Sequence, residues 1–393
     1  MLPYLLILIF VAGLGLFLCE RKPSREKDAF FLCLVSVILV LFAAARAETV
    51  GIDYGVYRDY FEQVRDGGWA FLTGPENRYR VEFGFSLLNY LISLMTGDVH
   101  VFMAVAAALM VGMAAVVLYR DCSMPWLGMF VFISFNFFGN TLSFIRQSLA
   151  IGLFLFAIRY LQNRRPLPYL LIVLLASSFH SSMLLLIPVY FLAQIPVNWK
   201  SVGVYTAGTG LVLFFSWPLF TFVTQFVYQG YASEEGLYFM NGRSWQTALI
   251  PVLTLFAALI MKKPLLVRRP GNVVLVNFSL YAGLLFIMTC KHFLFQRVAN
   301  IFFISAVLLL PELVQAVRVE TPDAKEAACV KAAGNREGHK ERLRRYRLDR
   351  SRFLRREAYY HYALGAVLCF GLLYNVWFLL QNRINLIPYL IFF

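Results

Sequence analysis

Charged residues are scarce in this 393-residue chain: only 15% of its residues are charged, whereas 60% are hydrophobic and 17% are aromatic. Soluble domains carry roughly a quarter charged residues, and a chain of this length could not bury so much apolar surface in a water-soluble core. The mean hydropathy of +0.66 agrees. The composition excludes a soluble nucleic-acid-binding protein, a secreted disulfide-rich scaffold and a disordered chain. It predicts a polytopic membrane protein.

The sequence also lacks the common cysteine and nucleotide-site motifs. None of its six cysteines pairs within an obvious outer loop, and no Cys-x-x-Cys or Cys/His zinc spacing occurs. Neither a disulfide framework nor a metal site is therefore expected. The HExxH, P-loop, GxSxG and dinucleotide-binding motifs are missing too. Their absence argues against nucleotide hydrolysis, zinc proteolysis and serine-hydrolase chemistry, and we expect no cofactor.

Apolar runs fill most of the chain. A hydrocarbon core of about 30 Å needs roughly 20 apolar helical residues, or fewer where a helix packs inside protein. We predict an all-α polytopic protein with a single transmembrane domain over residues 1–393 and about twelve spans. They lie near 2–19, 29–45, 100–119, 125–139, 141–161, 168–180, 182–196, 203–222, 246–261, 272–290, 298–314 and 359–380. Residues 168–196 could instead form one bent helix.

The two ends of the predicted spans differ in charge. The loops at 20–28, 159–168 and 262–271 are rich in Lys and Arg, and the stretch 315–358 is basic as well. These segments carry most of the 36 Lys and Arg residues. The positive-inside rule makes that side cytoplasmic. Both termini are then expected to be extracytoplasmic.

Two predicted outer loops are long, at 46–99 and 223–245. Loops of this length in compact proteins usually have a function. Within the first loop, residues 81–96 are apolar but carry Glu82 and Asn89. We therefore predict an interfacial helix there instead of a further span.

The cytoplasmic loop 315–358 ends in a distinctive pattern. Residues Arg342–Arg356 read as a basic amphipathic helix. Such a helix could bind anionic headgroups. The alternative is that its charges only anchor the cytoplasmic side of the neighbouring span.

Ionisable residues inside apolar runs are functional-site candidates, because a charge at membrane depth costs about 2.5 kcal/mol or more on insertion scales. Arg146 and Gln147 share one face of the span predicted at 141–161, near its outer end. A guanidinium can donate two parallel hydrogen bonds to a phosphate or a carboxylate. Arg146 is thus a candidate anion ligand. The alternative is an arginine that reaches the outer headgroups or pairs with a loop carboxylate.

His180 lies in the Ser-rich segment 177–182, also at the outer end of apolar runs. Imidazole can accept a proton near neutral pH, which an alcohol nucleophile would require. The alternative is a hydrogen-bonded structural histidine in a Ser-rich turn. The sequence therefore marks His180 as a candidate general base.

A second cationic cluster follows the tenth predicted span. Gln296, Arg297 and Asn300 can line one helical face. Lys291 and His292 would stand at the mouth of that face. A second strong cation suits a diphosphate, whose charge one arginine would not offset. The alternative is an outer loop with ordinary charges.

Carboxylates and aromatic residues occur in the first outer loop. Asp53 and Tyr57 lie in its first half, and Glu82 opens the predicted interfacial helix. The carboxylates could orient sugar hydroxyls or act as a base, and the aromatic rings could stack on sugars. A solvated or helix-capping Asp is the alternative.

These four clusters come from separate segments but all lie at one membrane face. A cationic pocket with a histidine and carboxylates at the outer interface suits a lipid-linked diphosphate. We therefore expect Arg146, His180 and Arg297 to meet in one extracytoplasmic cavity.

Five short segments of the sequence, which include the residues of these clusters, together resemble the EpsG family of bacterial exopolysaccharide proteins. These proteins are related to Wzy-type polymerases. The matching pieces are Asp53…Tyr57, Glu82–Gly84, Ser143–Ala150, Ala176–Ser182 and Arg297–Phe303. Their order and spacing hold from about residue 50 to 310. The basic stretch 315–358 is larger than the family pattern. A looser likeness to GT-C-type glycosyltransferases would place an Asp in the first outer loop, as Asp53 is.

The resemblance implies a glycosyltransferase that polymerises undecaprenyl-diphosphate-linked repeat units at the outer face of a bacterial inner membrane. The growing glycan would leave its lipid diphosphate and be transferred to a hydroxyl of an incoming lipid-linked unit. Its partners would be the lipid-linked oligosaccharide, the bilayer and a chain-length regulator protein, with no nucleic acid.

In this hypothesis Arg146 and Arg297 bind the donor diphosphate and stabilise its developing charge. His180 is the general base, with Asp53 as the competing candidate. The further substrate-binding candidates are Gln147, Tyr57, Glu82, His292, Lys291 and Asn300. Two alternatives remain. A flippase for lipid-linked oligosaccharide would spread polar residues through the midplane, and a membrane O-acyltransferase acting on polysaccharide would also use a His near a membrane face.

Overall fold

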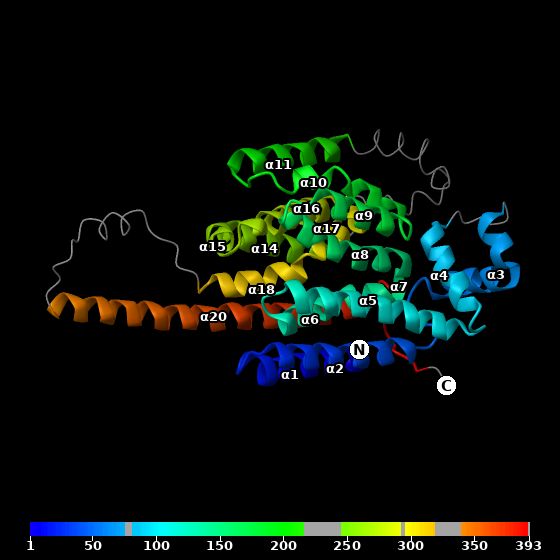
Figure 1. Cartoon of the computed structure of the whole chain (residues 1–393), viewed down its shortest axis with the longest axis horizontal. Helices are drawn as coiled ribbons and strands as arrows, with labels where there is room; N and C mark the ends of the chain where they lie inside the picture. The colour runs from blue at the N-terminus through cyan, green and yellow to red at the C-terminus, as the bar shows by residue number, and fades with distance from the viewer. Residues whose placement is uncertain (75–80, 216–244, 292–294, 319–338, 392–393) are drawn as a thin grey trace.

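The computed structural model describes residues 1–74, 81–215, 245–291, 295–318 and 339–391, with only the backbone given for 339–353. Within these residues the regular elements are helices, and the one β-bridge joins Arg46 to Ile391 (Figure 1). The predicted all-α architecture is therefore confirmed for the described chain.

The first half of the chain forms a series of helices that run back and forth along the bundle (Figure 1). They are α1 (Leu2–Leu14) with its π-helical extension η1 (Gly15–Glu20), α2 (Arg25–Ala44), α3 (Tyr54–Thr73), α4 (Phe83–Ser93), α5 (Val99–Asp121), α6 (Pro125–Ser134), α7 (Phe137–Ser143), α8 (Ile145–Gln162) and α9 (Pro166–Ser177). Local signals set several starts. The Ser24 side chain accepts a hydrogen bond from the Lys27 amide and caps α2, and prolines open α6 and α9.

The second half continues in the same manner. Its described elements are the 3₁₀-helix η2 (Ser181–Leu186), α10 (Val189–Leu192), α11 (Trp199–Phe214), α14 (Gln246–Ile260), α15 (Lys262–Arg268), the 3₁₀-helix η4 (Pro270–Asn272), α16 (Val273–Met288), α17 (Phe295–Phe303), α18 (Ala306–Ala316) and α20 (His339–Gln381). The start of α11 is fixed by a capping box, in which the Asn198 side chain accepts from the Ser201 amide and Ser201 accepts from the Asn198 amide.

Helix α6 lies inside the bundle, because all ten of its residues are buried. It packs against α1, α18 and α20. At Gly15 the backbone of η1 comes so close to Trp126 of α6 that a Cβ would lie 2.3 Å from the indole ring. Only glycine permits this approach.

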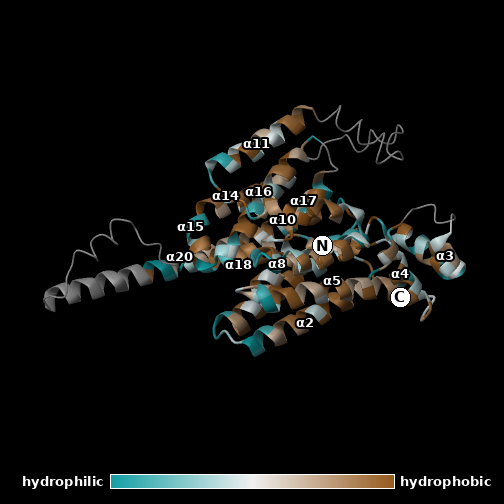
Figure 2. Ribbon diagram, turned by 45° about the horizontal axis from the view of Figure 1, so that its top comes forward, coloured by the Kyte–Doolittle hydropathy of each residue, from teal (hydrophilic) through white to brown (hydrophobic). Residues whose placement is uncertain are grey.

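Among the described residues, five helices are long and apolar enough to cross a membrane, or up to seven if each of two bent pairs counts as one span. Hydrophobic residues dominate the bundle, and hydrophilic residues gather near its two ends (Figure 2). The chain is therefore a multi-pass membrane protein. Helices α4, α6 and α9 are apolar but shorter. A count of twelve spans and a GT-C-like fold stay predictions.

The first outer loop contains more helix than the sequence analysis predicted. Helix α4 falls within the interfacial helix expected at 81–96, but α3 occupies residues that were predicted only as loop. It buries Tyr54, Tyr57, Phe61 and Val64 on one face. Charged residues lie between these positions, so the three- and four-residue spacing of the buried side chains is hard to recognise in the sequence.

The basic segments lie at one end of the bundle, and the segments that carry the candidate site residues lie at the other (Figure 1). The loop before α2, helix α15 and the start of α20 lie at one end, and α3, α4 and α7 lie at the other. Both termini lie toward the end that carries α3 and α4. The grouping of the basic loops agrees with the expected charge asymmetry, and their cytoplasmic location stays a prediction.

Residues 168–196 form a hairpin instead of one bent helix. The Tyr169 hydroxyl of α9 donates to the Leu186 carbonyl at 2.6 Å, and the rings of Tyr169 and Tyr190 lie 5.5 Å apart. The chain therefore turns back at His180. This turn brings His180 to the end of the bundle.

Three other predicted segments are only partly described. The span predicted at 203–222 corresponds to α11 as far as its end at Phe214, and the outer loop 223–245 lies outside the described residues except for its last residue. Of the basic loop 315–358, residues 319–338 lie outside them as well. Helix α20 starts within this loop and continues without a break into the last span, so the predicted helix 342–356 is part of α20.

Residues 382–391, which follow α20 and which we call the strap, cross the end of the bundle. The Gly51 amide donates to the Asn385 carbonyl at 2.9 Å, and the Ser143 hydroxyl donates to the Ile384 carbonyl at 3.1 Å. The strap therefore ties the start of the first outer loop to the end of α7.

Candidate functional site

One carboxylate joins three segments at the α3–α4 end of the bundle. Glu82, directly before α4, accepts a hydrogen bond from Arg146 Nη1 at 3.0 Å. Its other oxygen lies 3.3 Å from His180 Nδ1 and accepts from the Ser181 amide at 2.9 Å. The structure thus brings together Glu82, Arg146 and His180, which lie far apart in the sequence.

The backbone around Glu82 is fixed against the turn that carries His180. The amides of Gly84 and Phe85 both donate to the Ser178 carbonyl, at 2.7 and 3.3 Å. A Cβ at Gly84 would lie 2.3 Å from the Ser178 hydroxyl oxygen, so this contact requires glycine. The Gly two residues after Glu82 therefore has a structural reason: it lets the start of α4 lie against the His180 turn.

Glu82 is ionised over the physiological pH range. Burial opposes its charge, but hydrogen bonds from His180 and the Ser181 amide, together with the charge of Arg146, hold the pKa of Glu82 at about 2. An ionised carboxylate can only accept hydrogen bonds, so Nδ1 of His180 must carry a proton in this contact. In the neutral imidazole, Nε2 then has a free lone pair and can accept a proton.

Asp53 lies within the electrostatic influence of both arginines of the predicted diphosphate site. In the described chain it forms no ion pair within 4 Å, but the charges of Arg297 and Arg146 both act on it. Burial raises the pKa of Asp53, and the two arginines oppose that effect. Because both arginines act on the same carboxylate, Arg146 and Arg297 belong to one electrostatic environment.

Tyr57, one turn into α3, is buried beside Arg146. The hydroxyl of Tyr57 and the Arg146 guanidinium interact, and burial raises the pKa of Tyr57 so that it is a neutral phenol. Its ring packs 5.7 Å from that of Phe85. Tyr57 therefore holds one side of Arg146 while Glu82 holds the other.

Gln147 connects the arginine segment of α8 to α17. Its Nε2 donates to the backbone carbonyl of Arg297 at 2.6 Å. Arg297 lies in the first turns of α17, where its side chain lines a pocket together with Asn300. The two segments that carry the arginines are thus directly hydrogen-bonded to each other.

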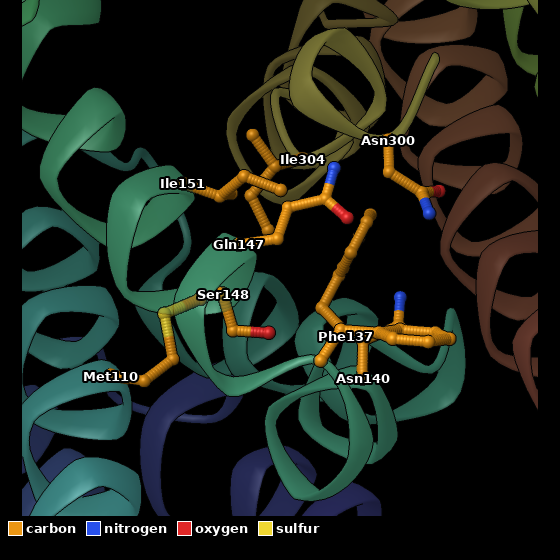
Figure 3. Close-up of a pocket in the computed structure, with 9 residues that line it drawn as sticks. Met110, Phe137, Asn140, Gln147, Ser148, Ile151, Asn300 and Ile304 are labelled. Atoms are coloured by element: carbon orange, nitrogen blue, oxygen red, sulfur yellow. The ribbon is translucent and has the colours of Figure 1, made fainter. Parts of the chain in front are cut away.

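Two narrow pockets adjoin at this contact. Both are lined by Asn140, Phe144, Gln147 and Asn300. The first also reaches Ser148, and Figure 3 shows the side chains of Gln147, Ser148 and Asn300 around it. The second extends to Gln296, Arg297, Phe378 and Ile384. Phe378 belongs to α20 and Ile384 to the strap, so the last part of the chain builds one wall.

Lys291, another candidate of the second cationic cluster, does not join this group. The Lys291 ammonium is exposed and donates to the Leu213 carbonyl at the end of α11, at 2.7 Å. It therefore ties α16 to α11. His292 lies outside the described residues. Of the predicted cluster, Arg297 and Asn300 reach the pocket.

Sequence reasoning missed several parts of this site. The Ser181 amide cannot be predicted from a side chain, and Asn140 was not singled out although it lies near Arg146 in the sequence. Phe378 and Ile384 carry no local signal, because their role depends on how α20 and the strap pack. No group of three or more His, Cys, Asp or Glu residues that could hold a metal ion occurs in the described ranges.

Comparison with known proteins identifies the family of this chain. A family model, described as the EpsG family, matches residues 29–321. No curated protein and no solved structure matches the chain. The matched range is well over half of the chain and includes Asp53, Glu82, Arg146, His180 and Arg297. The chain therefore belongs to the EpsG family.

Proposed function

We propose that this protein is a polysaccharide polymerase that transfers a growing glycan from undecaprenyl diphosphate to a lipid-linked repeat unit. Membership of the EpsG family suggests a Wzy-like, glycosyltransferase-type polymerase. The observation that carries the proposal is the Glu82 carboxylate, which holds Arg146 and His180 on its two oxygens. An anion-binding cation and a proton acceptor are thereby fixed next to each other.

The donor diphosphate would bind between Arg146 and Arg297. Arg146 uses Nη1 for Glu82 and also interacts with Tyr57, and its five N–H donors still leave some for an anion. When the glycan leaves, negative charge develops on the diphosphate, and preorganised guanidinium groups stabilise that charge most strongly. Two arginines match a leaving group that carries two phosphates.

The transfer step exchanges one C–O bond for another. The oxygen of the acceptor hydroxyl forms a bond to the anomeric carbon of the donor sugar, and the bond from that carbon to the diphosphate oxygen breaks. The diphosphate keeps the electron pair of the broken bond. Nε2 of His180 accepts the proton of the hydroxyl, and Glu82 stabilises the resulting imidazolium.

Asp53 is the competing candidate for the base. Its carboxylate lies in the field of both arginines, and burial raises its pKa. Once a diphosphate binds those arginines, Asp53 loses its compensating charges. A raised pKa would then favour proton uptake by Asp53. Substitution of each residue in turn separates the two candidates.

The site lies at the end of the bundle opposite the basic loops (Figure 1). The positive-inside rule then places the reaction at the outer face of a bacterial inner membrane. The prenyl tails would lie among the apolar helices, and the energy of transfer would come from the bond between the donor sugar and its diphosphate. The reaction would therefore need no nucleotide.

The proposal is tested by reconstituting the full chain in liposomes with a lipid-linked repeat unit and following the products. Polymer ladders are expected for the unmodified protein, and their loss is expected for Arg146→Ala and for His180→Ala. The matched controls are Arg58→Ala, which removes a half-exposed arginine paired with Glu48, and His361→Ala, which removes an exposed histidine. Both controls should form ladders.

Other products would indicate other functions. Translocation of the lipid-linked unit without ladders would indicate a flippase, and acyl transfer to the glycan would indicate an O-acyltransferase. Ladders that persist in both Arg146→Ala and His180→Ala would overturn the assignment of the site.

A further inference from the structure

Four neutral carboxamide side chains converge beside Arg297. They are Asn140, Gln147, Gln296 and Asn300, and we call the space between them the carboxamide pocket. They come from three helices, α7, α8 and α17. Figure 3 shows the amide groups of Gln147 and Asn300 projecting from facing helices toward the same space.

Much of the hydrogen-bonding capacity of this pocket is unused within the described chain. Gln296 Oε1 is buried and has no partner there. Gln147 uses Nε2 for the Arg297 carbonyl, which leaves Oε1. Asn140 Oδ1 accepts from Asn136 at 3.4 Å, which leaves its Nδ2 group. Buried polar atoms normally have partners, so open donors and acceptors together indicate a group that can both donate and accept.

The charge and the size of the pocket restrict the chemical class of its ligand further. Among the described residues, no carboxylate lines it, and Arg297 is the one charged residue of its lining. Its free space suits a group about the size of a water molecule. A hydroxyl meets each of these conditions, because it is neutral, small, and both a donor and an acceptor.

The surroundings fit a sugar that carries this hydroxyl. Phe144 and Phe378 line the pocket and supply its apolar wall, so that a hydroxyl can enter it while the sugar ring stays outside. Arg297 lines the same pocket as Gln296 and Asn300. A phosphate held by Arg297 would therefore place the sugar bonded to it against these carboxamides.

We propose that the carboxamide pocket binds a hydroxyl of the neutral sugar bonded directly to the donor diphosphate, and so selects which sugar can occupy that position. This proposal rests on the proposed function, since it takes Arg297 as a diphosphate ligand. A site built to hydrogen-bond a hydroxyl discriminates strongly against analogues that lack it, because its own polar groups would then stay unpaired. The pocket thereby separates sugar recognition from diphosphate recognition.

The test compares the affinity of the full-length protein for undecaprenyl diphosphate with and without one sugar. Undecaprenyl diphosphate carrying glucose, galactose or N-acetylglucosamine serves as the probe. We expect at least one sugar to tighten binding about tenfold or more, the scale of one or two net hydrogen bonds. Gln296→Leu should abolish this gain and leave the affinity for the bare lipid diphosphate unchanged, and Asn300→Leu should abolish the gain as well.

The controls separate this proposal from the proposed function. Gln194→Leu removes a carboxamide outside the pocket, where Gln194 donates to the Tyr190 carbonyl, and it should keep the gain. Arg297→Ala should weaken binding of the bare and the sugar-bearing lipids alike. Thermal unfolding in the same detergent verifies that each variant is folded.

Two results would overturn the inference. If the unmodified protein binds the bare and sugar-bearing lipids equally, or if both pocket variants keep the gain, the pocket holds only an ordered water and recognises no sugar. The diphosphate site would still stand in either case. If the bare lipid diphosphate does not bind at all, the proposed function fails first.

Discussion

Glu82 and His180 lie 98 positions apart in the sequence, yet a carboxylate oxygen of Glu82 is 3.3 Å from His180 Nδ1. The same carboxylate pairs with Arg146 through its second oxygen. A single acidic residue thus sets both the orientation of the imidazole and the position of the guanidinium.

The pH dependence of stability should reveal the contacts of Glu82. Its pKa of about 2 lies below its ordinary value of 4.5, so the ionised form is stabilised in the folded protein. This contribution is present above pH 4.5 and is lost as the pH falls toward 2, and it amounts to about 3 kcal/mol at most. Thermal unfolding should therefore show a gap between the unmodified protein and Glu82→Gln that narrows from pH 6 to pH 3. A gap independent of pH would contradict this contribution.

His180→Gln should lower the transfer rate without preventing donor binding. A carboxamide can keep a hydrogen bond to Glu82 but cannot act as a base, and general-base catalysis contributes about 10²–10⁴-fold. The loss should therefore appear in kcat of polymerisation, while the affinity for undecaprenyl diphosphate is unchanged. His361→Ala is the matched control. If Asp53→Asn shows that loss and His180→Gln does not, Asp53 is the base.

Arg146→Lys should reduce activity even though the charge is kept. An ammonium cannot reproduce the planar fork of a guanidinium that meets Glu82, Tyr57 and a phosphate at once. We expect a loss of about 10²–10³-fold in transfer rate, the range seen when one transition-state donor is removed. Arg58→Lys, on the same face of the membrane in our orientation, should have little effect. Equal losses in the two variants would indicate a general effect of charge geometry.

Replacing Asn385 should test the strap. Asn385 adopts a left-handed backbone conformation with φ of 52°, and its carbonyl accepts from the Gly51 amide, two residues before Asp53. Asn385→Val should destabilise the protein by about 1–2 kcal/mol, because a β-branched residue does not tolerate this conformation. Asn385→Gly should keep the stability. Thermal unfolding midpoints measure both, and a similar loss in the two variants would mean that the Asn side chain itself matters.

The sequence predicted those site residues whose charge has a high free-energy cost inside a membrane. Arg146 and His180 stand out because ionisable residues are rare at the ends of apolar runs, and the structure places both on Glu82. The free-energy cost of removing a charge from water depends on its immediate surroundings. A charged residue within an apolar run can therefore be recognised from that one segment of the sequence. The same reasoning pointed to Arg297 and Asn300.

Features that depend on packing between distant segments could not be predicted in this way. The helical face of α3 was missed because charged residues alternate with its buried aromatic residues. Lys291 was expected at the diphosphate site, but its ammonium donates to Leu213 of α11. Arg46 is almost fully buried, and it donates to the Leu142 carbonyl. Nothing in the residues around Arg46 indicates that contact.

The strap has a consequence for how such enzymes could diversify. Phe378 and Ile384, which line the space beside Arg297, lie beyond residue 321, where the family match ends. The arginines and the histidine lie within the match. Under the proposed function, a graft that exchanges only the final stretch of the chain with that of another family member would reshape one side of the proposed sugar pocket and leave the proposed catalytic residues unchanged. Such grafts would offer a route to polymers with altered repeat units.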